Sequence, residues 1–157
     1  MEMREEFNHL IEKAIELELN VAKLYYQFYS LFPSDADFWW QLTIEEKNHA
    51  ALLKTVQQMH DSHVEIPRDF YPASMQALEE SNQKILNVIL GFEKHPDRHR
   101  ALRTAYELEN SAGEIHYESF ANSLSSSRVA NIFQKLNGDD INHAQRIREY
   151  MNQLGLS

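Results

Sequence analysis

Apolar residues recur at steps of three and four along four long segments, and this period constrains the fold more than any other feature. The segments span about 2–32, 36–59, 97–124 and 128–154. Such steps place the apolar side chains on one face of a helix. The chain also has only four glycines and four prolines, so turns are few. The sequence therefore predicts an all-α fold rather than a many-stranded sheet.

The order of these segments predicts a four-helix bundle. Short turns at 33–35 and 125–127 make the first two and the last two helices antiparallel hairpins. A longer connection joins the second helix to the third. It begins with a loop over 60–72, which contains two prolines, and continues as a short extra helix over 74–90 that ends at Gly91.

Length and composition exclude several classes of protein. The 157 residues fit one domain, 1–157, with a sizeable core, and no interdomain linker is visible. The net charge of -9 and the lack of a basic stripe argue against nucleic acid and anionic membranes as partners. The absence of cysteine excludes disulfides, thiolate nucleophiles and iron–sulfur clusters. No apolar signal core opens the chain, so a cytoplasmic location is expected.

Two motifs occur twice, once in each half of the chain. "AIELELNVAKLYY" at 14–26 resembles "AYELENSAGEIHY" at 105–117. "IEEKNHA" at 44–50 has a weaker copy, "GDDINHA", at 138–144. The sequence therefore contains two helix hairpins of similar design. The repeat preserves polar residues within the apolar stripes, which core packing alone would not predict.

Carboxylates and histidines interrupt the four apolar stripes near their middle. The interrupting residues are Glu18, Glu46 with His49, Glu109, and Asp140 with His143. Residues three apart lie on one face of a helix, so each carboxylate–histidine pair is directed at one point. If all four stripes face the core, the six side chains converge there. Burying them unpaired would be costly, and mutual repulsion would force protons onto some carboxylates.

Two divalent cations would remove both penalties, because four carboxylates supply four negative charges and the imidazoles bind as neutral bases. Oxygen and nitrogen donors without sulfur suit iron or manganese, and zinc is compatible with them. A single carboxylate-x-x-His motif is common in solvated helices. Two copies, with a mid-stripe glutamate in each remaining helix, favour a metal site. No phosphate-binding loop, dinucleotide glycine pattern or nucleophile elbow is present.

More than one role is open for several residues beside these six. Tyr25 follows Glu18 by two turns on the same face, and is either a hydrogen-bond donor to a ligand carboxylate or an ordinary core tyrosine. His116 holds the equivalent place in the second repeat. It is expected to be a hydrogen-bond partner near the metals, a further histidine close to them, or a satisfied core histidine. Glu45 and Asp139 lie beside the stripes and are expected to be solvated.

At these residues the chain resembles the ferritin-like superfamily, and most of all the di-iron domain of rubrerythrins. The resemblance covers nearly the whole chain and rests on Glu18 with Tyr25, "EKNH" at 46–49, Glu109, and "DINH" at 140–143. It implies a ferritin-like bundle with a carboxylate-bridged pair of iron ions held by Glu18, Glu46, His49, Glu109, Asp140 and His143. Glu46 and one carboxylate of the second half would bridge the ions.

The resemblance also implies a function in oxidative stress. A non-haem di-iron oxidoreductase of the peroxidase or ferroxidase type would reduce peroxide or dioxygen. Rubrerythrins often carry a rubredoxin domain, which needs four cysteines. This chain has none, so electrons would come from an external donor such as a separate rubredoxin-like protein.

Two departures from the family leave alternatives open. Asp140 stands where the family usually has Glu, and Ala112 stands where rubrerythrins often have a further Glu. One alternative is an iron-binding, sequestering protein without turnover, although ferritins have a fifth helix and usually lack the second histidine. Another is a scaffold whose site has decayed, consistent with Asp140 and the helix-weakening Gly138. Exposed aromatic residues make a homodimer plausible.

Overall fold

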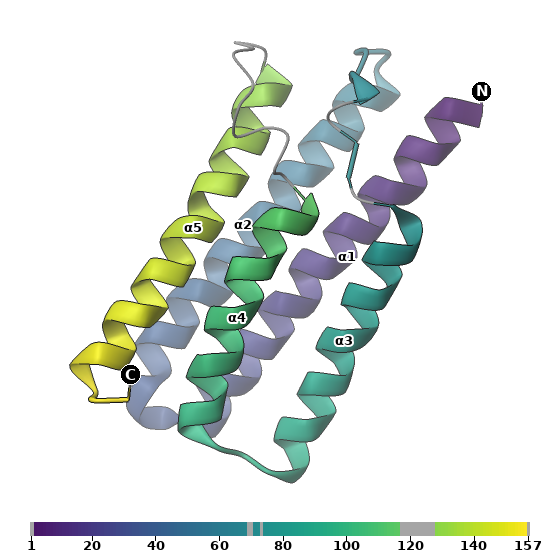
Figure 1. Cartoon of the computed structure of the whole chain (residues 1–157). Helices are drawn as coiled ribbons and strands as arrows, with labels where there is room; N and C mark the ends of the chain where they lie inside the picture. Colours follow the sequence, from purple (N-terminus) through teal and green to yellow (C-terminus); the bar gives the residue numbers. More distant parts are fainter. Residues whose placement is uncertain (1, 69–70, 73, 117–127, 157) are drawn as a thin grey trace.

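Helices account for all the regular structure that is described. The computed structural model describes residues 2–68, 71–72, 74–116 and 128–156, with side chains left out at 112–116. These residues contain five α-helices, one short 3₁₀ helix and no strand, so the predicted all-α class is confirmed (Figure 1). The elements are α1 (Glu2–Leu31), η1 (Pro33–Asp35), α2 (Ala36–Asp61), α3 (Met75–Lys94), α4 (Arg98–His116) and α5 (Arg128–Gln153).

The helices pack as two pairs with one extra helix. α1 packs along α2, and α4 packs along α5. α2 and α5 join the two pairs, while α3 lies against α1 (Figure 1). α1, α3 and α5 run in one direction and α2 and α4 in the other. α3 therefore occupies the connection in which the sequence predicts an extra helix.

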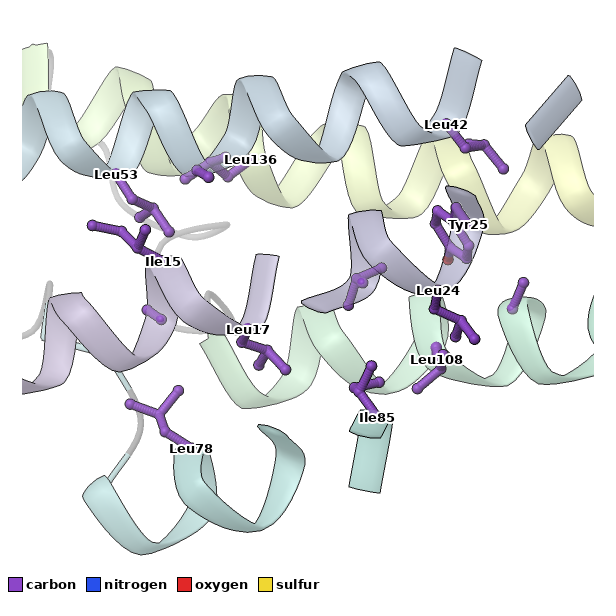
Figure 2. Close-up of a cluster of buried hydrophobic side chains, with 14 of the residues drawn as sticks. Ile15, Leu17, Leu24, Tyr25, Leu42, Leu53, Leu78, Ile85, Leu108 and Leu136 are labelled. Carbon is purple, nitrogen blue, oxygen red and sulfur yellow. The ribbon is translucent and has the colours of Figure 1, made fainter. Parts of the chain in front are cut away.

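The apolar stripes form one core. On α1 the buried face comprises Phe7, Leu10, Ile11, Ala14, Ile15, Leu17, Val21, Ala22, Leu24, Tyr25 and Phe28, interrupted by the buried Glu18. Figure 2 shows core side chains from all five helices, such as Leu24, Leu53, Ile85, Leu108 and Leu136. Removing this apolar surface from water is the main driving force for such packing. None of the described helices is both long and apolar enough to cross a membrane.

A buried carboxylate ties the η1 turn to the other helix pair. Asp35 is 1% exposed. Arg98, at the start of α4, donates from Nε to Asp35 Oδ2 and from Nη2 to Oδ1, both at 2.7 Å. The hydroxyl of Tyr150, near the end of α5, donates to Oδ1 at 2.6 Å. Burial alone would raise the pKa of Asp35, but these donors outweigh it and lower the pKa.

The structure corrects the predicted end of the extra helix. α3 does not end at Gly91 but continues to Lys94. Phe92 lies in this last turn and is 3% exposed. Its ring meets Phe28 edge-on, 4.7 Å between centroids, so burying an aromatic ring outweighs the weak helix propensity of glycine. The predicted continuation of the third long helix beyond residue 116, and the turn at 125–127, lie outside the described residues.

Asp35→Asn should lower the free energy of unfolding by about 1–3 kcal/mol at pH 7, because a buried charge-assisted network loses its charge. A carboxylate with a lowered folded-state pKa adds stability above its ordinary pKa of about 3.9 and loses it as pH falls. The difference between wild type and variant should therefore shrink below that pH. Urea unfolding of both proteins at several pH values measures this difference in the free energy of unfolding. Asp37→Asn, at a nearby exposed aspartate, is the control, and equal effects in both variants would contradict the role of Asp35.

Candidate metal centre

Six polar side chains meet in the middle of the apolar core. α1 supplies one of them, α2 two, α4 one and α5 two. Their exposed fractions are Glu18 6%, Glu46 2%, His49 1%, Glu109 4%, Asp140 3% and His143 1%. Charged residues are almost never buried to this degree without a partner. The structure thus brings together all six residues that the sequence predicts as metal ligands.

The six side chains form two groups that share one member. The first group is Glu46, Glu109, Asp140 and His143, and the second is Glu18, Glu46 and His49. Within each group, one donor atom per residue lies within 4.8 Å of all the others. Donors bonded to one ion at roughly 2.0–2.2 Å are roughly 3–4 Å from each other. Each group could therefore hold a metal ion, and Glu46 lies between the two positions.

Three buried atoms at the centre lack a hydrogen bond within the described part of the chain. They are Glu46 Oε1, His49 Nδ1 and His143 Nδ1. His143 Nδ1 lies 2.9 Å from Glu46 Oε1, and His49 Nδ1 lies 3.5 Å from Glu46 Oε2. Buried polar atoms are nearly always hydrogen-bonded. A bound cation would be ligated by nitrogen and oxygen atoms that lie close together without hydrogen bonds between them. The residues present therefore fit a metal centre.

The carboxylates cannot all be ionised without a counter-charge. Burial, reinforced by the charge of Glu109, raises the pKa of Glu46 to about 7. Burial, reinforced by the charge of Glu18, raises the pKa of Asp140 well above its ordinary value. Without metal these two groups therefore hold their protons up to a higher pH than exposed carboxylates do.

The two histidines behave in the opposite way. Burial alone would lower their pKa values, but contacts with carboxylates outweigh it. Glu18 and Glu46 raise the pKa of His49 to about 12. Glu109 and Glu46 raise the pKa of His143 to about 10. At pH 7 and without metal, both imidazoles therefore carry a proton and act as internal cations.

Each histidine also contacts a carboxylate on the other motif helix. His49 Nε2 on α2 lies 3.1 Å from Asp139 Oδ2 on α5, and His143 Nε2 on α5 lies 3.0 Å from Glu45 Oε2 on α2. We call these contacts the crossed pairs. Because Nε2 is engaged outside the centre, Nδ1 of each ring faces inward, which fixes the ring orientation that a ligand needs. The two rings stack with centroids 5.3 Å apart.

The crossed pairs correct the expectation that Glu45 and Asp139 are solvated. Their side chains are only 32% and 35% exposed. Arg146 Nη1 lies 2.7 Å from Glu45 and Lys135 Nζ lies 3.0 Å from Asp139. One signal in the sequence could have identified them, since an acidic residue immediately precedes the carboxylate–histidine motif in both repeats. Using that signal requires knowing that α2 and α5 are neighbours.

Tyr25 is a hydrogen-bond donor to a carboxylate of the centre. Its ring is fully buried, and its hydroxyl donates to Glu109 Oε1, from α1 to α4. Burial and the nearby charge of Glu109 raise the pKa of Tyr25, so the hydroxyl keeps its proton. Of the two roles open from the sequence, the structure shows the hydrogen-bonded one. The side chain of His116 lies outside the described residues.

Metal binding should release about two or more protons per chain at pH 7, because both imidazoles are protonated without metal and must lose that proton to bind it. Titrating Zn²⁺ calorimetrically, in buffers of different ionisation enthalpy, measures the number. The double variant His49→Gln/His143→Gln should release fewer protons. Release near zero by the wild-type protein would contradict the protonation described above.

Comparisons with known proteins return no match. No protein-family model, no curated protein and no solved structure matches this chain. The metal chemistry of the centre is therefore inferred from its donor atoms, their burial and their charge.

Proposed function

We propose that α1, α2, α4 and α5 form a ferritin-like four-helix bundle that holds two iron ions. We further propose that the protein is a non-haem di-iron oxidoreductase that reduces peroxide or dioxygen. One observation carries the proposal: two buried donor groups share Glu46. A carboxylate has two oxygens, so a residue common to both groups is suited to bridge two ions.

The donor set supports iron. Four carboxylates balance the charge of two divalent ions, and two imidazoles complete the set without sulfur. Such oxygen and nitrogen donors suit iron and manganese, and zinc is compatible with them. The first group combines Glu46, Glu109 and Asp140 with His143, and the second combines Glu18 and Glu46 with His49. The first group supplies four protein ligands and the second supplies three. An ion that prefers more ligands would therefore have a position left for a small molecule.

The protein's own contribution is to position the donors and exclude water. Bound iron supplies the electrons that reduce peroxide or dioxygen. The hydroxyl of Tyr25 holds Glu109 in one orientation, and the crossed pairs hold both imidazole rings. The surrounding apolar core lowers the local dielectric and strengthens the buried hydrogen bond from Tyr25 to Glu109. The chain has no cysteine, so we propose an external electron donor, such as a separate rubredoxin-like protein.

The structure also bears on the alternative of a decayed site. Asp140 has a shorter side chain than Glu but lies in the same group as three other donors. α5 runs continuously through Gly138, so glycine does not break the helix beside the motif. A scaffold without metal would retain buried, unsatisfied polar atoms, each of which destabilises the fold. These features favour a functional centre.

The first test is anaerobic loading with Fe²⁺. The wild-type protein should bind two ions per chain, measured by metal analysis after gel filtration. Glu46→Gln should lose at least one ion, because it removes the shared carboxylate. Glu16→Gln, at an exposed glutamate of α1, should keep both. Peroxide should then oxidise the bound iron, and repeated cycles with a chemical reductant should show turnover. A single oxidation without further cycles would indicate sequestration instead.

Asp139→Asn should weaken metal binding by roughly 10–100-fold, because the acid that orients the His49 ring loses its charge. Competition with a chromophoric chelator measures the affinity. Glu149→Gln, at an exposed position on the same helix, serves as the control. Unchanged affinity in Asp139→Asn would show that the crossed pair does not support the centre.

A further inference from the structure

A pocket lies beside the metal centre, between α1, α3 and α4. Its volume is about 100 Å³, and the four carboxylates of the centre line one part of it. Away from these carboxylates, most of its exposed wall is apolar and comes from Leu17 and Val21 of α1, Ile85 of α3 and Leu108 of α4, and Ser81 and Ser111 also line it. Figure 2 shows Leu17, Ile85 and Leu108 coming from these three helices. The exposed Lys84 of α3 also lines the pocket and marks its outer end.

Hydrogen bonds to α1 on both sides of Ile85 hold this wall in place. Before it, Asn82 Oδ1 accepts from Asn20 Nδ2 at 2.8 Å, and Asn82 Nδ2 donates to the backbone oxygen of Lys13 at 3.1 Å. After it, Gln27 Nε2 donates to the backbone oxygen of Ile89 at 2.8 Å. Ile85 is thereby fixed against α1, and the pocket is preformed. The extra helix thus has a role that the four-helix centre alone does not require.

The lining identifies the class of molecule that fits. Ligand pockets are mostly apolar, with a few polar groups that orient the ligand. A fully apolar cavity of roughly 150 Å³ holds benzene, so the apolar part of this pocket suits a short hydrocarbon chain. Peroxide and dioxygen are too small to cover these walls. Lys84 forms no ion pair with any residue that the structure describes, so its ammonium group is available to an anion.

We propose that this pocket binds a small organic molecule with a short apolar chain and an anionic head group. The chain lies among Leu17, Ile85 and Leu108 and points toward the centre, and the head group pairs with Lys84. This inference rests on the proposed function, since the inner end of the pocket is the proposed metal centre. The inference adds an organic ligand to a site for which the metal-binding residues alone suggest only peroxide or dioxygen as substrate.

The test uses Zn²⁺-loaded protein, so that its result does not depend on turnover. Acetate, hexanoate and hexan-1-ol are titrated by calorimetry. Hexanoate should bind at least about 10-fold more tightly than acetate, because each buried methylene adds affinity. Lys84→Met should weaken hexanoate binding about 2–5-fold, as expected for an exposed charge pair, and leave hexan-1-ol binding unchanged. Lys94→Met, at another exposed lysine of α3, should change neither.

A pocket-filling variant supplies the second arm. Ile85→Trp should abolish binding of both hexanoate and hexan-1-ol, while Ile89→Phe, one turn along α3, should retain it. If circular dichroism shows that Ile85→Trp does not fold, Ser81→Tyr blocks the pocket from a half-buried position that also lines it.

The possible failures are distinguishable. Metal analysis tests the proposed function, and acid binding, measured with and without Zn²⁺, tests the pocket. If acetate and hexanoate bind equally and Lys84→Met has no effect, the acids bind only through the metal and the inference is overturned. If hexanoate binds neither the Zn²⁺-loaded nor the metal-free protein, the inference is also overturned. The pocket would then serve only as a passage for peroxide or dioxygen.

Discussion

The desolvation of six ionisable side chains is the constraint on which this structure depends. Four carboxylates and two imidazoles lie in an apolar core, where an isolated charge is strongly disfavoured. Without metal, the imidazoles are protonated and the pKa values of Glu46 and Asp140 are raised, so that part of the charge is cancelled internally. That arrangement leaves Glu46 Oε1 and both Nδ1 atoms without hydrogen bonds within the described part of the chain. The middle of the four helices that carry these residues is therefore shaped by electrostatics as well as by apolar packing.

The helices and the six clustered residues could be predicted from the sequence because both follow from periodicity. A carboxylate within an apolar stripe faces the core if the stripe does, and its recurrence in a second hairpin argues against chance. The crossed pairs could not be predicted this way, since Asp139 contacts His49 only because α5 lies beside α2. The end of α3 also depends on a distant partner, because Phe28 buries Phe92. The hydrogen bond from Tyr25 to Glu109 likewise requires knowing how α1 faces α4.

The two halves of the chain are alike at the centre but different around it. Each contributes one mid-stripe glutamate and one carboxylate–histidine pair. In the described part of the chain, the additional helix α3 packs along α1 of the first half, and apolar side chains from α1, α3 and α4 line a pocket there. A second difference is that Asp140 stands at the position equivalent to Glu46, with a side chain one methylene shorter. An approximately symmetric set of donors is thus placed in an asymmetric environment.

The crossed pairs have the geometry of an isologous contact, in which two like surfaces exchange equivalent interactions. His49 takes its partner from the second hairpin, and His143 takes its partner from the first. Neither hairpin contains a complete set of contacts for its own histidine. The centre is therefore a property of the interface between the halves, and its energetics are those of association rather than of either hairpin. Substitutions in opposite halves should consequently be coupled, with effects that do not add.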